Sequence, residues 1–148
     1  WWVEDIVYGR WTPQETAERV FSAVDKYKPV AVGIERGIAQ QAVMEPLQDL
    51  MRRTARVFRI DLLTHGNKKK QDRILWALQG KFEHGKIKLK KGDWNIEFVD
   101  EASAFPSQLV NDDLLDALSY CDQMAILPYS MGGDLEDDYE PFDAVAGY

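Results

Sequence analysis

Apolar residues along the 148-residue chain follow two patterns, a helical spacing and short continuous runs, which alternate along the sequence. The sequence TPQE predicts a capping box at Thr12, and apolar residues then continue at helical spacing as far as Tyr27. Pro29 is expected to end this helix. The run VAVGIE that follows, residues 30–35, is typical of a strand buried on both faces.

Similar patterns predict the remaining elements. Strands are expected at residues 1–9 and 55–63, and a short strand within residues 85–94. Helices are expected between residues 38 and 53, over 67–80, around 95–104, and from 112 to about 127. Alternating strands and helices indicate one α/β domain, residues 1–130, with helices on both faces of its sheet. The segment 131–148 is expected to be a disordered acidic tail.

The net charge of −7 conceals an uneven distribution. Residues 52–91 carry thirteen Lys or Arg against three acids, whereas residues 131–148 carry six acids and neither Lys nor Arg. The basic segment can therefore bind a polyanion although the whole chain is acidic. A solvated charged surface is the plainer interpretation of the same counts.

Several kinds of site are disfavoured by the sequence. His65 and His84 lie in predicted loops without a Cys or His nearby, which argues against a zinc site. No Walker-type phosphate loop is present, so this chain carries no ATPase of its own. No apolar run approaches the about 20 residues of a membrane span, so we expect no membrane partner.

The predicted helix that begins at residue 112 carries an acidic stripe. On a helical wheel Asp112, Asp116 and Asp113 lie at about 0°, 40° and 100°, and Gln123 and Tyr120 share their arc. Asp112 and Asp113 can be explained as first-turn acids that complement the helix dipole. Asp116 is expected beyond the first turn, among leucines, where that explanation does not apply. Three carboxylates in one arc repel each other unless a cation lies between them.

Glu35 is the charged end of the predicted buried strand 30–35. It can be an ordinary residue facing water, but ligands of open α/β sheets bind at the carboxyl ends of strands. Together with the acidic stripe, Glu35 predicts a cage of oxygen ligands for Mg²⁺ or Mn²⁺. Two such ions, about 3.5–4 Å apart, can activate water and stabilise the leaving oxygen of a phosphodiester.

The segments VGIERG (32–37) and NDDLLDALSY (111–120) resemble motifs of the nuclease domain of the large terminase subunit of tailed bacteriophages and herpesviruses. Three other segments share the resemblance: WWVEDIVYGRWTP, KKKQDRILWALQGKFEHGKI and FPSQLVNDDLLDAL. It extends over nearly all of residues 1–127. The resemblance implies an RNase H-like fold, a mixed sheet flanked by helices, which RuvC-type Holliday-junction resolvases share.

The resemblance also implies a function and a role for each acid. Glu35 would be the second metal-binding acid, and Asp113 and Asp116 the terminal Asp-x-x-Asp pair, all three being catalytic. Asp112 would be a neighbour in the metal site. The implied activity is two-metal endonucleolytic cleavage of double-stranded DNA at viral genome packaging, in the host cytoplasm. The implied partners are an upstream ATPase motor domain, the portal protein and the small terminase subunit.

Lys68, Lys69 and Lys70 stand at the start of a predicted helix, where the helix dipole disfavours cations. A solvated surface tolerates that cost, so an ordinary basic patch is one interpretation. A DNA backbone nearby is the other, because lysines and free helix N–H groups both attract phosphate. Arg73 would extend such a DNA-binding patch.

One part of the family pattern has no counterpart in the sequence. The family's first acid is an Asp on the first, central strand of the sheet, and no matching strand precedes VGIERG. We therefore expect the polypeptide to continue upstream of Trp1, the present sheet to lack its central strand, and the chain alone to be inactive as a nuclease. The alternative is that Asp5 serves as the first acid on a rearranged sheet.

Two other functions remain open at this point. A RuvC-like Holliday-junction resolvase would share the acids and act as a dimer on branched DNA. A non-catalytic RNase H-like module would bind DNA after the loss of an acid. Cleavage of linear against four-way DNA separates the two enzymes, and a metal titration separates both from the module.

Overall fold

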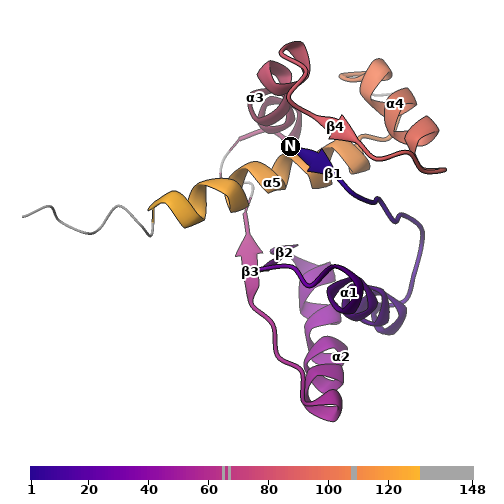
Figure 1. Cartoon of the computed structure of the whole chain (residues 1–148), viewed down its shortest axis with the longest axis vertical. Coiled ribbons are helices and arrows are strands. Elements are labelled where there is room, and N and C mark those ends of the chain that lie inside the picture. Colours follow the sequence, from indigo (N-terminus) through magenta and orange to yellow (C-terminus); the bar gives the residue numbers. More distant parts are fainter. Residues whose placement is uncertain (65, 67, 108–109, 131–148) are drawn as a thin grey trace, which may run out of the picture.

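The computed structural model describes residues 1–64, 66, 68–107 and 110–130 (Figure 1). The elements, in chain order, are β1 (Trp2–Val3), α1 (Pro13–Tyr27), β2 (Val32–Glu35), α2 (Ile38–Thr54), β3 (Ile60–Leu63), α3 (Lys70–Glu83), β4 (Lys88–Leu89), α4 (Asn95–Ala104) and α5 (Asp113–Ser130). The predicted α/β class is confirmed, and helices with small parallel sheets are compatible with an RNase H-like domain. The predicted acidic tail, 131–148, lies outside the described residues.

The capping box predicted for α1 is present. The Glu15 amide donates to the Thr12 hydroxyl over 3.3 Å, and the Glu15 carboxylate accepts the Thr12 amide over 2.8 Å. The helix ends before Pro29, as predicted. There Lys28 takes a left-handed conformation with φ of 49° and donates its amide to the carbonyl of Val24.

The strands of the described residues form two parallel pairs. β2 pairs with β3 so that Glu35 lies opposite Leu63, and β1 pairs with β4 so that Val3 lies opposite Leu89. The strand predicted at 1–9 was too long, because only Trp2 and Val3 pair in a ladder. The short strand predicted within residues 85–94 is confirmed as β4.

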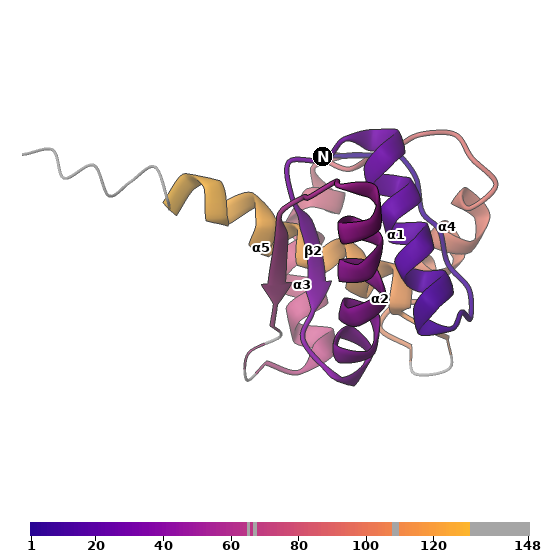
Figure 2. The same cartoon turned by 90° about the horizontal axis from the view of Figure 1, so that it is seen from below.

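α5 connects two groups of elements. In Figure 1, α1, α2, β2 and β3 lie at one end of the molecule, β1, β4, α3 and α4 lie at the other, and α5 runs between them. Figure 2 shows β2 and β3 side by side with α1 and α2 next to them. α5 contacts α3, α4, β2 and β3, so this single helix packs against both groups of elements.

The main hydrophobic core lies between α3, α4 and α5. Its buried members are Ile74, Ala77, Leu78, Trp94, Phe98, Leu114, Leu115 and Leu118. Phe98 is 1% exposed and meets the Trp94 ring edge-on, with ring centroids 6.2 Å apart. A second, separate contact joins α1 and α2, where Ala17 and Leu47 are fully buried. No helix in the described ranges is both long enough and apolar enough to cross a membrane.

Gly33 permits the close approach of α5 to the β2–β3 pair. A Cβ atom at this position would lie 2.5 Å from Sδ of Met124 on α5 and 2.6 Å from Cδ1 of Leu63 on β3. Both distances are shorter than van der Waals contact, so a larger residue would force these side chains away. The absence of a side chain on β2 therefore helps to set the distance between the strand and the helix.

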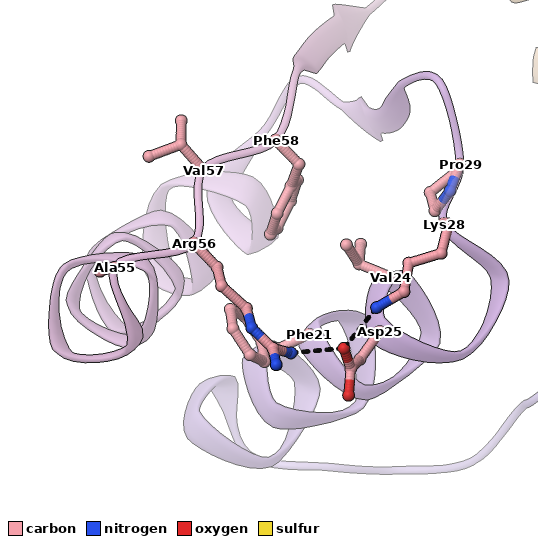
Figure 3. A pocket seen from close by; sticks show the side chains of 9 residues that line it. All are labelled: Phe21, Val24, Asp25, Lys28, Pro29, Ala55, Arg56, Val57 and Phe58. Carbon is pink, nitrogen blue, oxygen red and sulfur yellow. Dashed lines mark hydrogen bonds and ion pairs between the residues drawn. The ribbon is translucent and has the colours of Figure 1, made fainter.

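A surface hollow of about 420 Å³ opens where the ends of α1 and α2 meet the segment before β3 (Figure 3). Phe21 and Phe58 line it, with ring centroids 6.2 Å apart. Asp25 accepts a hydrogen bond from Lys28 over 2.6 Å and another from Arg56. None of the acids predicted to bind metal lines this hollow, so it is separate from the candidate active site.

The core predicts a large effect for truncation of Phe98. Phe98→Ala should lower the free energy of unfolding by about 3–5 kcal/mol, because it leaves a cavity where three helices meet. Chemical denaturation measures the change. Ile96→Ala on the same helix is the control, since Ile96 is 72% exposed, and should change stability by less than about 0.5 kcal/mol. Equal effects of the two substitutions would contradict this placement of the core.

Candidate active site

The three aspartates of the predicted acidic stripe lie at the start of α5. The Asp116 amide donates to the Asp112 carbonyl over 2.9 Å, so Asp112 immediately precedes the first turn. Asp113 and Asp116 both belong to that turn, so the prediction that Asp116 lies beyond the first turn was wrong, because the helix begins at Asp113 and not at Asp112. Their side chains differ in exposure: Asp113 is 79% exposed, Asp112 25% and Asp116 13%. Asp116 is thus largely buried, and its charge requires a partner.

All three carboxylates converge on one ammonium group. Nζ of Lys70 lies 2.6 Å from Asp112, 3.3 Å from Asp113 and 3.3 Å from Oδ2 of Asp116. Burial by itself lowers the pKa of Lys70, but the hydrogen bond with Asp112 and the charges of Asp116 and Asp112 outweigh it and raise the pKa above 10.5. Lys70 is therefore a cation wherever these carboxylates are ionised. The cation expected between the acids is, in this conformation, a lysine.

Arg73 is the second positive group at the acids. Its Nη2 lies 2.6 Å from Oδ1 of Asp116, and both side chains are at least 87% buried. The contact is a close ion pair without hydrogen-bond geometry, because Oδ1 has no hydrogen-bond donor among the described residues. The guanidinium group also lies 4.2 Å from the centre of the Tyr120 ring. Arg73 therefore holds one oxygen of Asp116 and leaves the other directed towards Lys70.

Tyr120 links Glu35 to these residues. Tyr120 is 6% exposed, and burial together with a hydrogen bond to Glu35 raises its pKa above 10.0. Glu35 is exposed at the carboxyl end of β2, as predicted from the sequence. Glu35 and Asp116 both act electrostatically on Tyr120, so the structure gathers the strand-end acid and the helix acids around one tyrosine.

Glu101 fixes the start of α5 from α4. It is 5% exposed, and its carboxylate accepts the amide of Leu115 over 2.7 Å and also a hydrogen bond from the amide of Leu114. A carboxylate at helix N–H groups satisfies donors that have no partner inside the helix. Glu101 was not predicted from the sequence. Its helical spacing with Phe98 and Phe105 places an acid on an apolar face of the helix, and that pattern could have indicated a buried carboxylate.

The predicted DNA-binding residues fall into two pairs. Lys70 and Arg73 are directed to the aspartates of α5. Lys68 and Lys69 are exposed just before α3, and Nζ of Lys68 lies 5.4 Å from the centre of the Trp76 ring. A hollow of about 540 Å³ beside them is also lined by Arg73. DNA binding by the four residues stays a prediction.

A family comparison identifies the domain that holds these residues. Residues 1–124 match the family model described as a terminase RNaseH-like domain. The chain belongs to this family. No curated protein and no solved structure matches the chain. The matched range of the terminase RNaseH-like domain contains Glu35, all three aspartates of the stripe, and the two cations that face them.

The carboxylate oxygens in this terminase RNaseH-like domain are of the chemical type that binds a hard divalent cation. Asp112, Asp113 and Asp116 offer only carboxylate oxygens, which Mg²⁺ and Mn²⁺ prefer, and they already surround a positive group. Their oxygens lie farther from Nζ of Lys70 than the about 2.0–2.1 Å of a Mg²⁺–oxygen bond. Within the described part of the chain, no group of three or more His, Cys, Asp or Glu is arranged to hold a metal ion. The distances between Lys70 Nζ and the three carboxylates are thus those of ion pairs with an ammonium group and not those of metal–oxygen bonds.

The environment of Glu101 predicts a specific pH dependence of stability. Burial, opposed by the two amide hydrogen bonds and reinforced by the charges of Asp113 and Asp112, raises the pKa of Glu101 above 4.5. The folded state then binds the proton more tightly than the unfolded state, so this contribution to stability is complete below about pH 4.5 and is lost as pH rises through the folded pKa.

Glu101→Gln keeps an oxygen acceptor and removes the titration. The free energy of unfolding of the wild type minus that of Glu101→Gln should therefore fall as pH rises from 4.5 towards neutrality. Denaturant unfolding at several pH values measures this difference. Glu97→Gln, an exposed position on the same helix, should show no such trend. A difference that rises with pH would mean that the folded state prefers the ionised carboxylate.

Proposed function

We propose that this chain is the nuclease domain of a viral DNA-packaging terminase and that it cleaves double-stranded DNA as a metal-dependent endonuclease. One observation carries the proposal. In a member of the terminase RNaseH-like family, three carboxylates at the start of one helix converge on a single positive group beside the end of a β-strand that carries a glutamate.

Glu35, Asp113 and Asp116, with Asp112 beside them, are the residues that would hold two Mg²⁺ or Mn²⁺ ions. Such ions, when bound, activate a water molecule and stabilise the leaving oxygen of a phosphodiester. Neighbouring side chains of the chain itself position the acids. Arg73 holds one oxygen of Asp116, which leaves the other oxygen available for a cation.

The acids are in turn held by their neighbours. The hydrogen bond between Tyr120 and Glu35 joins the end of β2 to α5. Glu101 holds the first turn of α5 through the amide of Leu115. Ligands held by packed and hydrogen-bonded neighbours keep their arrangement when substrate binds, so these contacts favour a preorganised catalytic site.

Among the described residues, a strand pairs with one edge of β2 only. The amide of Val32 donates to the carbonyl of Arg59, just before β3, and the amide of Arg36 donates to the carbonyl of Leu63 on β3. Because parallel strands bond through alternate residues, the amide of Gly33 faces the other edge of β2. We propose that a further strand pairs with this edge and brings the first catalytic Asp next to Glu35. The same proposal includes action together with an ATPase motor domain, a portal protein and a small terminase subunit in the host cytoplasm.

Removal of one helix acid tests the nuclease proposal. Asp116→Asn should reduce Mn²⁺-dependent cleavage of linear double-stranded DNA by the terminase that contains this domain, by about 10²-fold or more, because a metal ligand is lost. Asp122→Asn is the control: Asp122 lies on the same helix but pairs with Lys81 over 2.7 Å, and its loss should leave cleavage unchanged. Undiminished cleavage by Asp116→Asn would contradict the proposed site, and preferential cleavage of four-way junctions would favour a resolvase.

The exposed lysines before α3 should bind DNA without reading its sequence. The double substitution Lys68→Ala/Lys69→Ala should weaken binding equally on unrelated duplexes and reduce the slope of log affinity against log salt by about 2, because two phosphate contacts are lost. Filter binding at several salt concentrations measures both quantities. Lys26→Ala/Lys28→Ala removes the same charge at the end of α1 and is the control. A loss confined to one DNA sequence, or equal losses in both variants, would contradict the assignment.

A further inference from the structure

Lys70 occupies the point on which the carboxylates of Asp112, Asp113 and Asp116 converge, at distances of 2.6, 3.3 and 3.3 Å. We infer that its ammonium group is a built-in competitor of the divalent cation, which has to displace Lys70 from the aspartates in order to bind. The inference rests on the proposed function, because it concerns the same metal-binding acids.

The two cationic side chains at the aspartates differ in their freedom to leave. The Arg73 side chain is 9% exposed, lies over the Tyr120 ring and contacts Oδ1 of Asp116. The Lys70 side chain is 40% exposed and belongs to the first residue of α3. Its flexible four-carbon stem lets the ammonium group move into water without movement of the helix. Arg73 is thus a fixed counter-ion, and Lys70 is a removable one.

The balance of charge favours exchange of Lys70 for the metal. With Lys70 in place, two positive side chains face three aspartates, and one negative charge is left over. A divalent ion in place of Lys70 would neutralise these residues, whereas a divalent ion beside Lys70 would add repulsion between two cations at short range. Both groups would also need the same oxygens, such as Oδ2 of Asp116. Lys70 and the ion therefore exclude each other.

The present spacing agrees with a lysine-closed form of the site. No described cluster of three acids is arranged to hold a metal ion, although three acids contact one ammonium group. The carboxylates would have to draw inwards around a smaller ion once the ammonium group has left. Lys70 then has two effects: it stabilises the acids in the absence of metal, and it weakens the apparent affinity for metal by the fraction of molecules in which it is seated.

Isothermal titration of the full chain with Mn²⁺ tests the inference without reference to cleavage. Lys70→Met removes the charge with little change of length and should bind Mn²⁺ about tenfold more tightly than the wild type. Its melting temperature without metal should be lower, and the rise on addition of Mn²⁺ should be larger. Lys86→Met, at an exposed lysine to which no role in the site is assigned, makes the same change of net charge and should bind Mn²⁺ as the wild type does.

A second variant decides the matter if Lys70→Met does not fold. Lys70→Arg keeps the charge and offers a bidentate fork to the carboxylates, so it should bind Mn²⁺ more weakly than the wild type. Equal Mn²⁺ affinities for Lys70→Met and Lys86→Met, or tighter binding by Lys70→Arg, would overturn the inference. The proposed function would survive that result if Asp116→Asn still removed Mn²⁺ binding. No Mn²⁺ binding by the wild type or any variant would overturn the inference, and the cleavage assay of Asp116→Asn would then test the proposed function separately.

Discussion

Three carboxylates at the start of one helix repel each other, and the candidate site depends on how the fold balances that charge. α3 supplies the balance from its own first turn, since Lys70 and Arg73 are three residues apart and share a face of the helix. Further along α3, Ile74 and Leu78 belong to the hydrophobic core. Electrostatic pairing at one end and apolar packing along the remainder therefore fix α3 against α5 together.

The position of α5 determines which acids can act together. Gly33 lets Met124 approach β2 closely, and the hydrogen bond between Tyr120 and Glu35 joins the strand end to the same helix. From the other side, Glu101 holds the amides at the start of α5. α5 is thus held by β2 on one side and by α4 on the other. The acids lie where β2, α3 and α5 meet. A site built at such a junction can be rigid although its individual strands are short.

Much of the fold was predictable from local rules. The capping box at Thr12, the end of α1 before Pro29 and the helix that carries Asp116 depend only on neighbouring residues, and all three are confirmed. The strand lengths were not predictable in the same way, because a ladder needs a partner from another part of the chain, and Trp2–Val3 find one only at Lys88–Leu89.

The site was predictable in its acids but not in its cations. Helical periodicity placed the aspartates in one arc, and the end of a buried strand drew attention to Glu35. Lys70, however, meets Asp113 across 43 residues of sequence, and no local pattern indicates that pairing. A run of lysines at a helix start fits a solvated basic surface and a DNA-binding patch equally well, so the sequence alone did not indicate that Lys70 contacts the aspartates. Glu101 escaped notice for the same reason, because its partners lie on another helix.

The central claim is that the carboxylates around Lys70 form a divalent-cation site that the lysine closes in the absence of metal. A crystal structure of the full chain with Mn²⁺, recorded with anomalous scattering, tests it most directly. The account predicts an anomalous peak among Asp112, Asp113 and Asp116, with Nζ of Lys70 moved out of contact with all three. A structure at saturating Mn²⁺ with no peak at these residues and Lys70 still seated between them would contradict it.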